Sequence, residues 1–291
     1  MTPFRIIRIA AALALPAAGG CAAPPALTPA GASRSLTIAA VSMESRLRDP
    51  AGNLARVEAW TGLAADGGAE LVLFPEATLS GWWASREIRR WAETIDGPSI
   101  RRLIELAGRR GVALAVGMTE RDGDRVYIAH VLLDGRGVIG VHRKTRLAPG
   151  EEQYWDPGDD ARVFEYRGIR LGIAICYESI HPEMCARLRA AGAEIILAPY
   201  ANGTDPDELT AGKRDYVYAR ARENGVWYVA CDAPPRDERG RLGRGAVYFI
   251  DPSGRLLELT GVSAAGESMI IRTIRLPGAA PPRRPSTEEA S

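Results

Sequence analysis

The stretch GIRLGIAICYES, residues 168–179, is an apolar run that ends in a thiol, Cys176, with a carboxylate, Glu178, two residues later. A short apolar run of this kind predicts a strand buried on both faces. The residues that follow, HPEMCARLRAAGA, predict a helix with Pro182 in its first turn. A strand followed directly by a helix is typical of a layered α/β domain. The thiol therefore lies between the predicted strand and the predicted helix.

The same alternation continues on both sides of this stretch. Short β-like runs alternate with segments of helical spacing, and Asp134-Gly135 and Pro252-Ser253-Gly254 indicate hairpins. The hairpins argue against a purely parallel sheet, and nothing between residues 35 and 276 resembles a linker, so we predict one α/β domain there. The predicted strands are 35–43, 70–76, 112–120, 194–200, 226–233 and 268–276, the hairpins are 125–144 and 244–259, and the helices are 53–69, 99–111 and 207–225.

The two ends of the chain differ from this domain. Residues 1–21 contain Arg5 and Arg8, then an apolar stretch and small residues, which is the layout of a secretory signal. Cys21 follows Ala18-Gly19-Gly20 and resembles the acylated cysteine of a bacterial lipoprotein, although Ala18 replaces the usual leucine. Plain secretion and a cytosolic protein with an unusual leader remain alternatives. We expect 22–34 to be a flexible linker and 277–291 a disordered tail.

Composition excludes some partners and draws attention to the cysteines. The 291 residues carry 37 Lys and Arg against 36 Asp and Glu, so no charge excess predicts binding to nucleic acid. If Cys21 is acylated, Cys176, Cys185 and Cys231 remain, and an odd number cannot all pair in an oxidising compartment. At least one thiol therefore stays free. No Cys/His group has the spacing of metal ligands, so we expect neither a metal nor another cofactor.

Three potentially reactive side chains follow predicted strands. Glu76 ends LVLFPE, where partial burial raises a carboxyl pKa and suits a general base. Lys144 follows the second strand of the first hairpin, where an ammonium could stabilise an oxyanion. Cys176 becomes a nucleophile if neighbouring groups favour its thiolate. Taken singly, each has an ordinary explanation as a surface or core residue.

Taken in order, these stretches resemble the carbon–nitrogen hydrolase (nitrilase) superfamily. The matching blocks are FPEATLSG, HRKTRLAPGE, AICYE, AGAEIILAPYA and ARARENGVWYVACDA, and the resemblance extends over nearly the whole domain. It implies a four-layer α-β-β-α sandwich that forms a homodimer or a higher homo-oligomer. It also implies that Cys176 attacks the carbon of a C–N bond and that Glu76 transfers the proton. Lys144 and the backbone N–H of Tyr177 would hold the oxyanion, and water would release a thioester.

The resemblance also concerns neighbouring residues. A further supporting glutamate is expected after the lysine, with spacing that favours Glu151 over Glu152. The family commonly has an acidic residue two positions after the nucleophile, and we interpret Glu178 as structural, bonded to backbone amides of the turn. His142 shares strand parity with Lys144, so its side chain could face the site. Ala246 departs from the family's usual serine before the second hairpin, so substrate contacts of other branches are not transferable.

The sequence leaves the reaction partly open. Tyr177 after the nucleophile, followed by Glu178, is common among the family's amidases, so we predict an amidase acting on a small carboxamide through a thioester. A nitrilase or an N-acyltransferase using the same cysteine is the alternative, as is a tethered non-catalytic binding protein. The expected partner is a small-molecule substrate, with membrane contact only through Cys21. The expected location is the periplasm or cell envelope.

Overall fold

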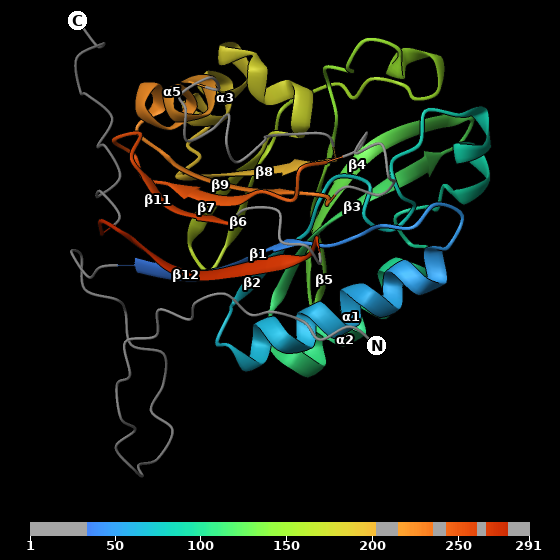
Figure 1. The fold of residues 1–291 in the computed structure, drawn as a ribbon, viewed down its shortest axis with the longest axis horizontal. Helices are drawn as coiled ribbons and strands as arrows, with labels where there is room; N and C mark the ends of the chain where they lie inside the picture. Colours follow the sequence, from blue (N-terminus) through green and yellow to red (C-terminus); the bar gives the residue numbers. More distant parts are fainter. Residues whose placement is uncertain (1–33, 202–214, 235–242, 261–265, 279–291) are drawn as a thin grey trace, which may run out of the picture.

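Two six-stranded sheets form the centre of the molecule (Figure 1). The computed structural model describes residues 34–201, 215–234, 243–260 and 266–278. The predicted signal, Cys21, nearly all of the linker and tail, and the first part of the predicted helix 207–225 lie outside these residues. The first sheet has the order β12-β1-β2-β3-β4-β5 and the second β11-β10-β9-β8-β7-β6. Both are mixed, as the predicted hairpins require.

The first sheet and its helices come mainly from the first half of the chain. Strands β1, β2 and β3 are parallel, whereas β4, β5 and β12 join by antiparallel pairing. The bounds are β1 Arg34–Ser42, α1 Pro50–Asp66, β2 Leu71–Leu73, a 3₁₀ helix Arg86–Trp91, α2 Pro98–Arg110, β3 Ala113–Asp122, β4 Arg125–Asp134, β5 Gly137–Arg143 and β12 Ser268–Leu276.

The second sheet repeats this plan. Strands β7, β8 and β9 are parallel, and β6, β10 and β11 are added by antiparallel pairing. The bounds are a 3₁₀ helix Glu151–Gln153, β6 Val163–Tyr166, β7 Ile169–Ile173, a 3₁₀ helix Cys176–Ile180, α3 Pro182–Ala190, β8 Ile195–Tyr200, α5 Asp215–Asn224, β9 Trp227–Asp232, β10 Val247–Ile250 and β11 Leu256–Thr260.

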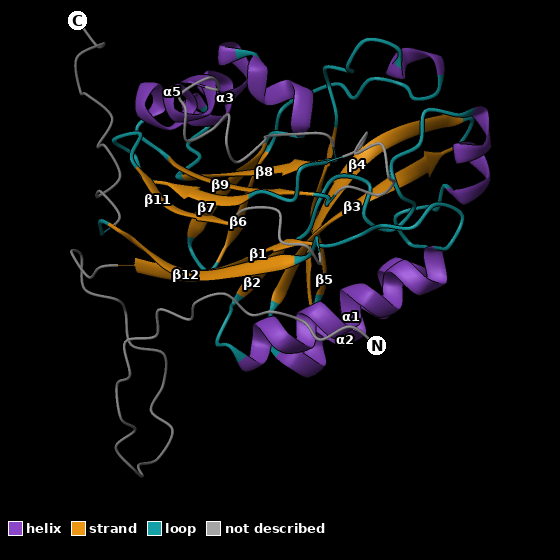
Figure 2. Cartoon of the chain, in the orientation of Figure 1, coloured by secondary structure: helices purple, strands orange, loops and turns teal. Residues whose placement is uncertain are grey.

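The layers follow from alternation along the strands. In β1, Ile38 and Ala40 face the apolar core between the sheets, whereas Ala39 and Val41 face the core under α1 and α2. Helices α3 and α5 cover the outer face of the second sheet in the same way (Figure 2). Each leucine or isoleucine fully buried in these cores contributes about 1.5–3 kcal/mol. The result is the expected α-β-β-α sandwich.

Local signals explain where the helices begin and end. Asp49 accepts a hydrogen bond from the Gly52 N–H at 2.9 Å and caps α1, while Pro98 and Pro182 occupy the first turns of α2 and α3. Helix α2 ends at Gly111, whose φ of 68° favours glycine. Strand β6 and the 3₁₀ helix Arg86–Trp91 were not predicted.

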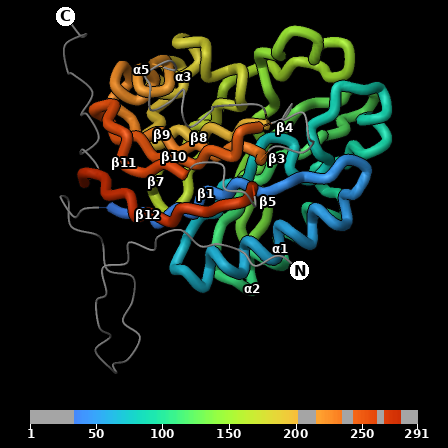
Figure 3. Tube along the Cα trace, in the orientation of Figure 1, coloured from blue at the N-terminus to red at the C-terminus, as the bar shows by residue number. Residues whose placement is uncertain are grey.

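The ends of the described chain lie side by side. Strand β12 pairs antiparallel with β1 over its whole length, from Arg34 opposite Leu276 to Ser42 opposite Ser268. Figure 3 shows the two strands adjacent, one from each end of the colour range. In the described ranges no helix has both the length and the apolar character needed to cross a membrane.

Candidate active site

The thiol lies on a sharp turn at the carboxyl end of β7. Cys176 has φ of 48°, in the left-handed region that side chains other than glycine rarely adopt. It starts the 3₁₀ helix Cys176–Ile180. The first backbone N–H of this helix that bonds a carbonyl is that of Glu178, which donates to the Ile175 carbonyl at 3.0 Å. The N–H of Tyr177, the second residue of this helix, therefore has no carbonyl partner within it. It is available to an oxyanion beside the sulfur.

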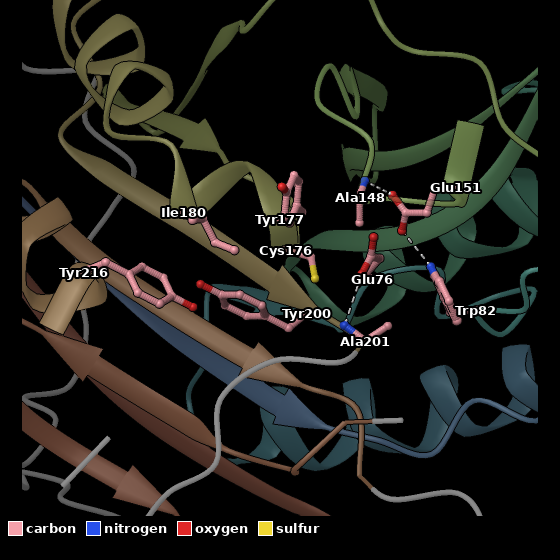
Figure 4. Close-up of a pocket in the computed structure, with 10 residues that line it drawn as sticks. All are labelled: Glu76, Trp82, Ala148, Glu151, Cys176, Tyr177, Ile180, Tyr200, Ala201 and Tyr216. Carbon is pink, nitrogen blue, oxygen red and sulfur yellow. Dashed lines mark hydrogen bonds between the residues drawn. The ribbon is translucent and has the colours of Figure 1, made fainter. Parts of the chain in front are cut away.

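Glu76 reaches the same place from the other sheet. It follows β2, and the next residue, Ala77, also has a left-handed φ, of 52°. Ala201 N–H donates to the carboxylate at 3.1 Å, and the Cys176 sulfur faces the same carboxylate (Figure 4). Gly117 on β3 makes the approach possible, because a Cβ there would lie 2.4 Å from the Ala77 nitrogen. A carboxylate from one sheet thus meets a thiol from the other.

Lys144 is fully buried and connects two carboxylates. Its Nζ lies 2.8 Å from Glu76 Oε1 and 2.9 Å from Glu151 Oε2. Burial alone would lower the pKa of this ammonium, but Glu76, Cys176 and Glu151 outweigh that effect and raise it. The lysine is therefore a permanent cation beside the thiol.

The structure places Glu151, and not Glu152, at the lysine. The Glu151 carboxylate also accepts hydrogen bonds from Trp82 Nε1 at 3.0 Å and Ala148 N–H at 2.7 Å. Glu152 is exposed and accepts from the Gly150 N–H at the start of the same 3₁₀ helix. Glu151 is thus held by three donors and shares the ammonium with Glu76.

Burial governs the proton balance of the nucleophile and its neighbour. Burial raises the pKa of Glu76, although the Lys144 charge opposes this shift. Burial and the Glu76 charge also raise the pKa of the Cys176 thiol well above its usual range. At neutral pH the sulfur therefore carries its proton, and an attack needs a base in contact with it. The Glu76 carboxylate, which faces the sulfur, is placed to be that base.

Cys176, Glu76 and Glu151 line a small pocket of about 150 Å³ (Figure 4). The Cys176 sulfur and the Glu76 carboxylate face each other in it, and Trp82 stands next to Glu151. Its wall is mostly uncharged and partly aromatic. The lining residues are Glu76, Trp82, Ala148, Glu151, Cys176, Tyr177, Ile180, Tyr200, Ala201 and Tyr216.

Several lining residues were not singled out from the sequence. Tyr200 ends β8, the parallel neighbour of β7, and Ala201 follows it. The carboxyl ends of parallel strands meet at one sheet edge, so this signal was present. Tyr216 on α5 carried no comparable signal. Two tryptophans follow Gly81: Trp82 lines the pocket, whereas the ring centre of Trp83 lies 4.5 Å from the Arg48 guanidinium.

The other histidines and cysteines that the structure describes lie outside the pocket wall. His142 bonds Glu178 rather than pointing into the pocket, and Cys185 and Cys231 are buried, with the pKa of Cys185 raised by burial to about 12. Among the described side chains no group of three or more His, Cys, Asp or Glu could hold a metal ion. The reactive groups that line the described pocket include the Cys176 thiol and the carboxylates of Glu76 and Glu151, and the Lys144 ammonium bonds both carboxylates.

A thiol with an adjoining carboxylate and ammonium, placed between the two sheets of an α-β-β-α sandwich, defines a thiol-dependent hydrolase. The family model for carbon–nitrogen hydrolases matches residues 37–284. The chain belongs to the carbon–nitrogen hydrolase family, also called the nitrilase superfamily.

Known proteins similar to this chain are named as amidases and nitrilases. An (R)-stereoselective amidase of a Pseudomonas species is 31% identical over 222 residues, covering 76% of this chain and 80% of the relative. A nitrilase of Pyrococcus abyssi is 31% identical over 226 residues, covering 76% and 84%. The crystal structure of an amidase from Nesterenkonia sp. superimposes with a TM-score of 0.72 at 26% identity, covering 83% of this chain and 90% of that one. A variant of that amidase adds the acetamide moiety of fluoroacetamide at its active-site cysteine.

Proposed function

We propose that this protein is an amidase that hydrolyses small, uncharged carboxamides through a thioester on Cys176. The observation that carries the proposal is the arrangement around Glu76, whose carboxylate faces the Cys176 sulfur in the pocket (Figure 4) and bonds the buried Lys144 ammonium at 2.8 Å. The named amidases among its relatives support the choice of amides over nitriles.

The geometry suits a two-step reaction. Glu76 accepts the thiol proton as the sulfur bonds to the carbonyl carbon, and the carbonyl π electrons move to oxygen. Lys144 and the Tyr177 N–H stabilise that oxyanion. When the oxyanion collapses, the C–N bond breaks, the proton on Glu76 passes to the nitrogen, and ammonia leaves a thioester. Water, losing a proton to Glu76, then attacks the thioester, and the carboxylic acid and the free thiol are released.

The pocket favours a neutral acyl group of limited size. A cavity of about 150 Å³ accommodates a molecule about as large as benzene. In the described part of its wall the only charged groups are Glu76 and Glu151, and both already share the single Lys144 ammonium. A carboxylate on the acyl group would therefore meet a negative field.

We expect the enzyme to prefer 4-methylpentanamide to the isosteric anion succinamate by at least about 10-fold in kcat/KM, since one opposed charge costs roughly 1–4 kcal/mol at these distances. Ammonia release by the full chain measures both rates. Equal or better use of succinamate would contradict the neutral pocket. Faster turnover of 4-methylpentanenitrile than of the amide would instead identify a nitrilase.

The pH profile tests the role of Glu76. Because the base must be deprotonated, kcat/KM should fall as the pH decreases through the pKa of Glu76. Burial raises this pKa, so the midpoint of the acid limb should lie above 4.5, the ordinary glutamate value. A plot of log kcat/KM against pH on a neutral amide locates the limb. A midpoint at or below 4.5 would contradict the assigned base.

We also propose, from the sequence alone, that the enzyme is exported and forms a homo-oligomer. Residues 1–21 would direct export to the periplasm or cell envelope, and acylation of Cys21 would anchor the enzyme to a membrane. The family resemblance supports a homodimer or higher homo-oligomer. Labelling with a radioactive fatty acid, with Cys21→Ser as control, tests the anchor, and sedimentation of the purified chain tests the assembly.

A further inference from the structure

A buried carboxylate outside the pocket joins the two segments that carry Lys144 and Cys176. Glu178 is fully buried, and its two oxygens hold different segments. Oε1 accepts hydrogen bonds from the backbone N–H and the hydroxyl of Thr145, both at 2.7 Å. Oε2 accepts from the backbone N–H of Ile175 at 2.7 Å. Thr145 is the residue after the lysine, and Ile175 is the residue before the cysteine.

His142 completes this arrangement. Its Nε2 lies 2.8 Å from Glu178 Oε2, and its ring is fully buried on β5, two residues before Lys144. Since Oε2 is an acceptor, Nε2 is the donating nitrogen. Burial would raise the pKa of Glu178, but His142 and Thr145 outweigh it and hold the pKa below its ordinary value, so the bridging group is a carboxylate.

We infer that Glu178 is a positioning residue that sets the distance between the Lys144 ammonium and the Cys176 sulfur, with His142 orienting its carboxylate. The inference rests on the proposed amidase reaction. The strands bearing the two groups belong to different sheets, so no ladder of backbone hydrogen bonds fixes β5 relative to the turn after β7. The carboxylate bonds backbone on both sides, one residue from each reacting group. A shift of about 1 Å in such a site can cost about 10²-fold in rate.

Glutamine is the sharpest replacement because it keeps the shape and loses one acceptor. With its amide oxygen at the Oε1 position, the NH₂ group faces the Ile175 N–H, and in the opposite orientation it faces the Thr145 N–H. In either orientation, one of the hydrogen bonds between the two segments is replaced by an N–H that faces another N–H. At His142, glutamine retains a donor near the Nε2 position, whereas methionine removes it.

The experiment compares Glu178→Gln, His142→Gln and His142→Met with wild type on a neutral amide and in alkylation of Cys176 by iodoacetamide, mapped by peptide mass spectrometry. We expect Glu178→Gln to lower kcat about 10²-fold with KM within about 3-fold, and to slow alkylation. His142→Met should lower kcat about 10-fold, and His142→Gln should restore most of it. Val226→Ala is the control, since Val226 is buried just before β9, at the end of that strand away from the pocket, and its truncation should lower stability alone.

The outcomes separate the possible failures. Wild-type kcat in folded Glu178→Gln, or a loss no larger than that of Val226→Ala at equal stability, overturns the inference. If Glu178→Gln does not fold, equal kcat for His142→Met and His142→Gln overturns it. If wild type hydrolyses no amide, the proposed function fails, and the alkylation rates of the same variants still decide the positioning role.

Discussion

Replacing Cys176 with alanine is expected to lower kcat on a neutral amide by on the order of 10⁵-fold, because the reaction then has no nucleophile to form the thioester. The fold should persist, because alanine retains the Cβ and the Cys176 side chain is only partly buried. Ammonia release gives the rate. Cys176→Ser should retain a slow residual turnover, because the hydroxyl is a weaker nucleophile in the same place.

Fluoroacetamide provides a second measurement of the same prediction. In a Glu76→Gln background, which lacks the base for hydrolysis, the sulfur should displace fluoride, and the peptide containing Cys176 should gain the mass of one carboxamidomethyl group. Glu76→Gln combined with Cys176→Ala should gain none there. Cys185→Ala is the matched control, since Cys185 is buried with a raised pKa and should contribute neither activity nor label. Activity of Cys176→Ala within about 10-fold of wild type would refute the thioester mechanism.

Replacing Lys144 with methionine is expected to damage both stability and activity. The change leaves Glu76 and Glu151 buried together without their shared cation, which typically costs 3–5 kcal/mol. Loss of the oxyanion partner should lower kcat by about 10²–10³-fold. Urea unfolding and amide hydrolysis measure the two effects.

The sign of the pH dependence distinguishes this cause from simple loss of packing. Without the lysine, the two carboxylates can avoid repulsion only by taking up a proton, so their pKa values in the folded variant rise above those of the unfolded chain. Folding is then favoured at low pH and weakened as the pH rises through the folded values. The variant should therefore approach wild-type stability toward pH 5 and diverge from it toward pH 8.

A double variant supplies the control. Lys144→Met combined with Glu151→Gln removes one of the opposed charges and should recover stability at pH 8 without recovering activity. An unfolding midpoint for Lys144→Met equal to that of wild type at pH 8 would contradict the electrostatic role assigned to the lysine.

The sequence predicted the individual strands of this fold better than their arrangement in sheets. Apolar alternation identified nearly every strand that surrounds the site, because period and turn residues are local properties. It did not separate β6 from the loop before β7, although VFEY followed by Arg167-Gly168 forms a hairpin with it. Nor did any local pattern indicate that the strands divide into two sheets, since that depends on contacts between distant segments.

Prediction of the site from the sequence had the same limit. The order of Glu76, Lys144 and Cys176 was recognisable through family resemblance, and spacing favoured Glu151, which the structure places 2.9 Å from the lysine. Glu178 was interpreted as bonding backbone amides, and it does. That one of these amides belongs to Thr145, more than thirty positions away, has no local signature. Tyr216 reaches the pocket from α5 for a comparable reason.

The pairing of β1 with β12 has a consequence for synthesis of the chain. During translation β1 leaves the ribosome first, but its outer neighbour is completed only at residue 276, so one edge of the first sheet stays open until then. Contacts of such long sequence separation form slowly and leave a partly assembled chain prone to association. A chaperone that binds nascent polypeptides should therefore raise the yield of folded protein, most clearly when elongation is slow.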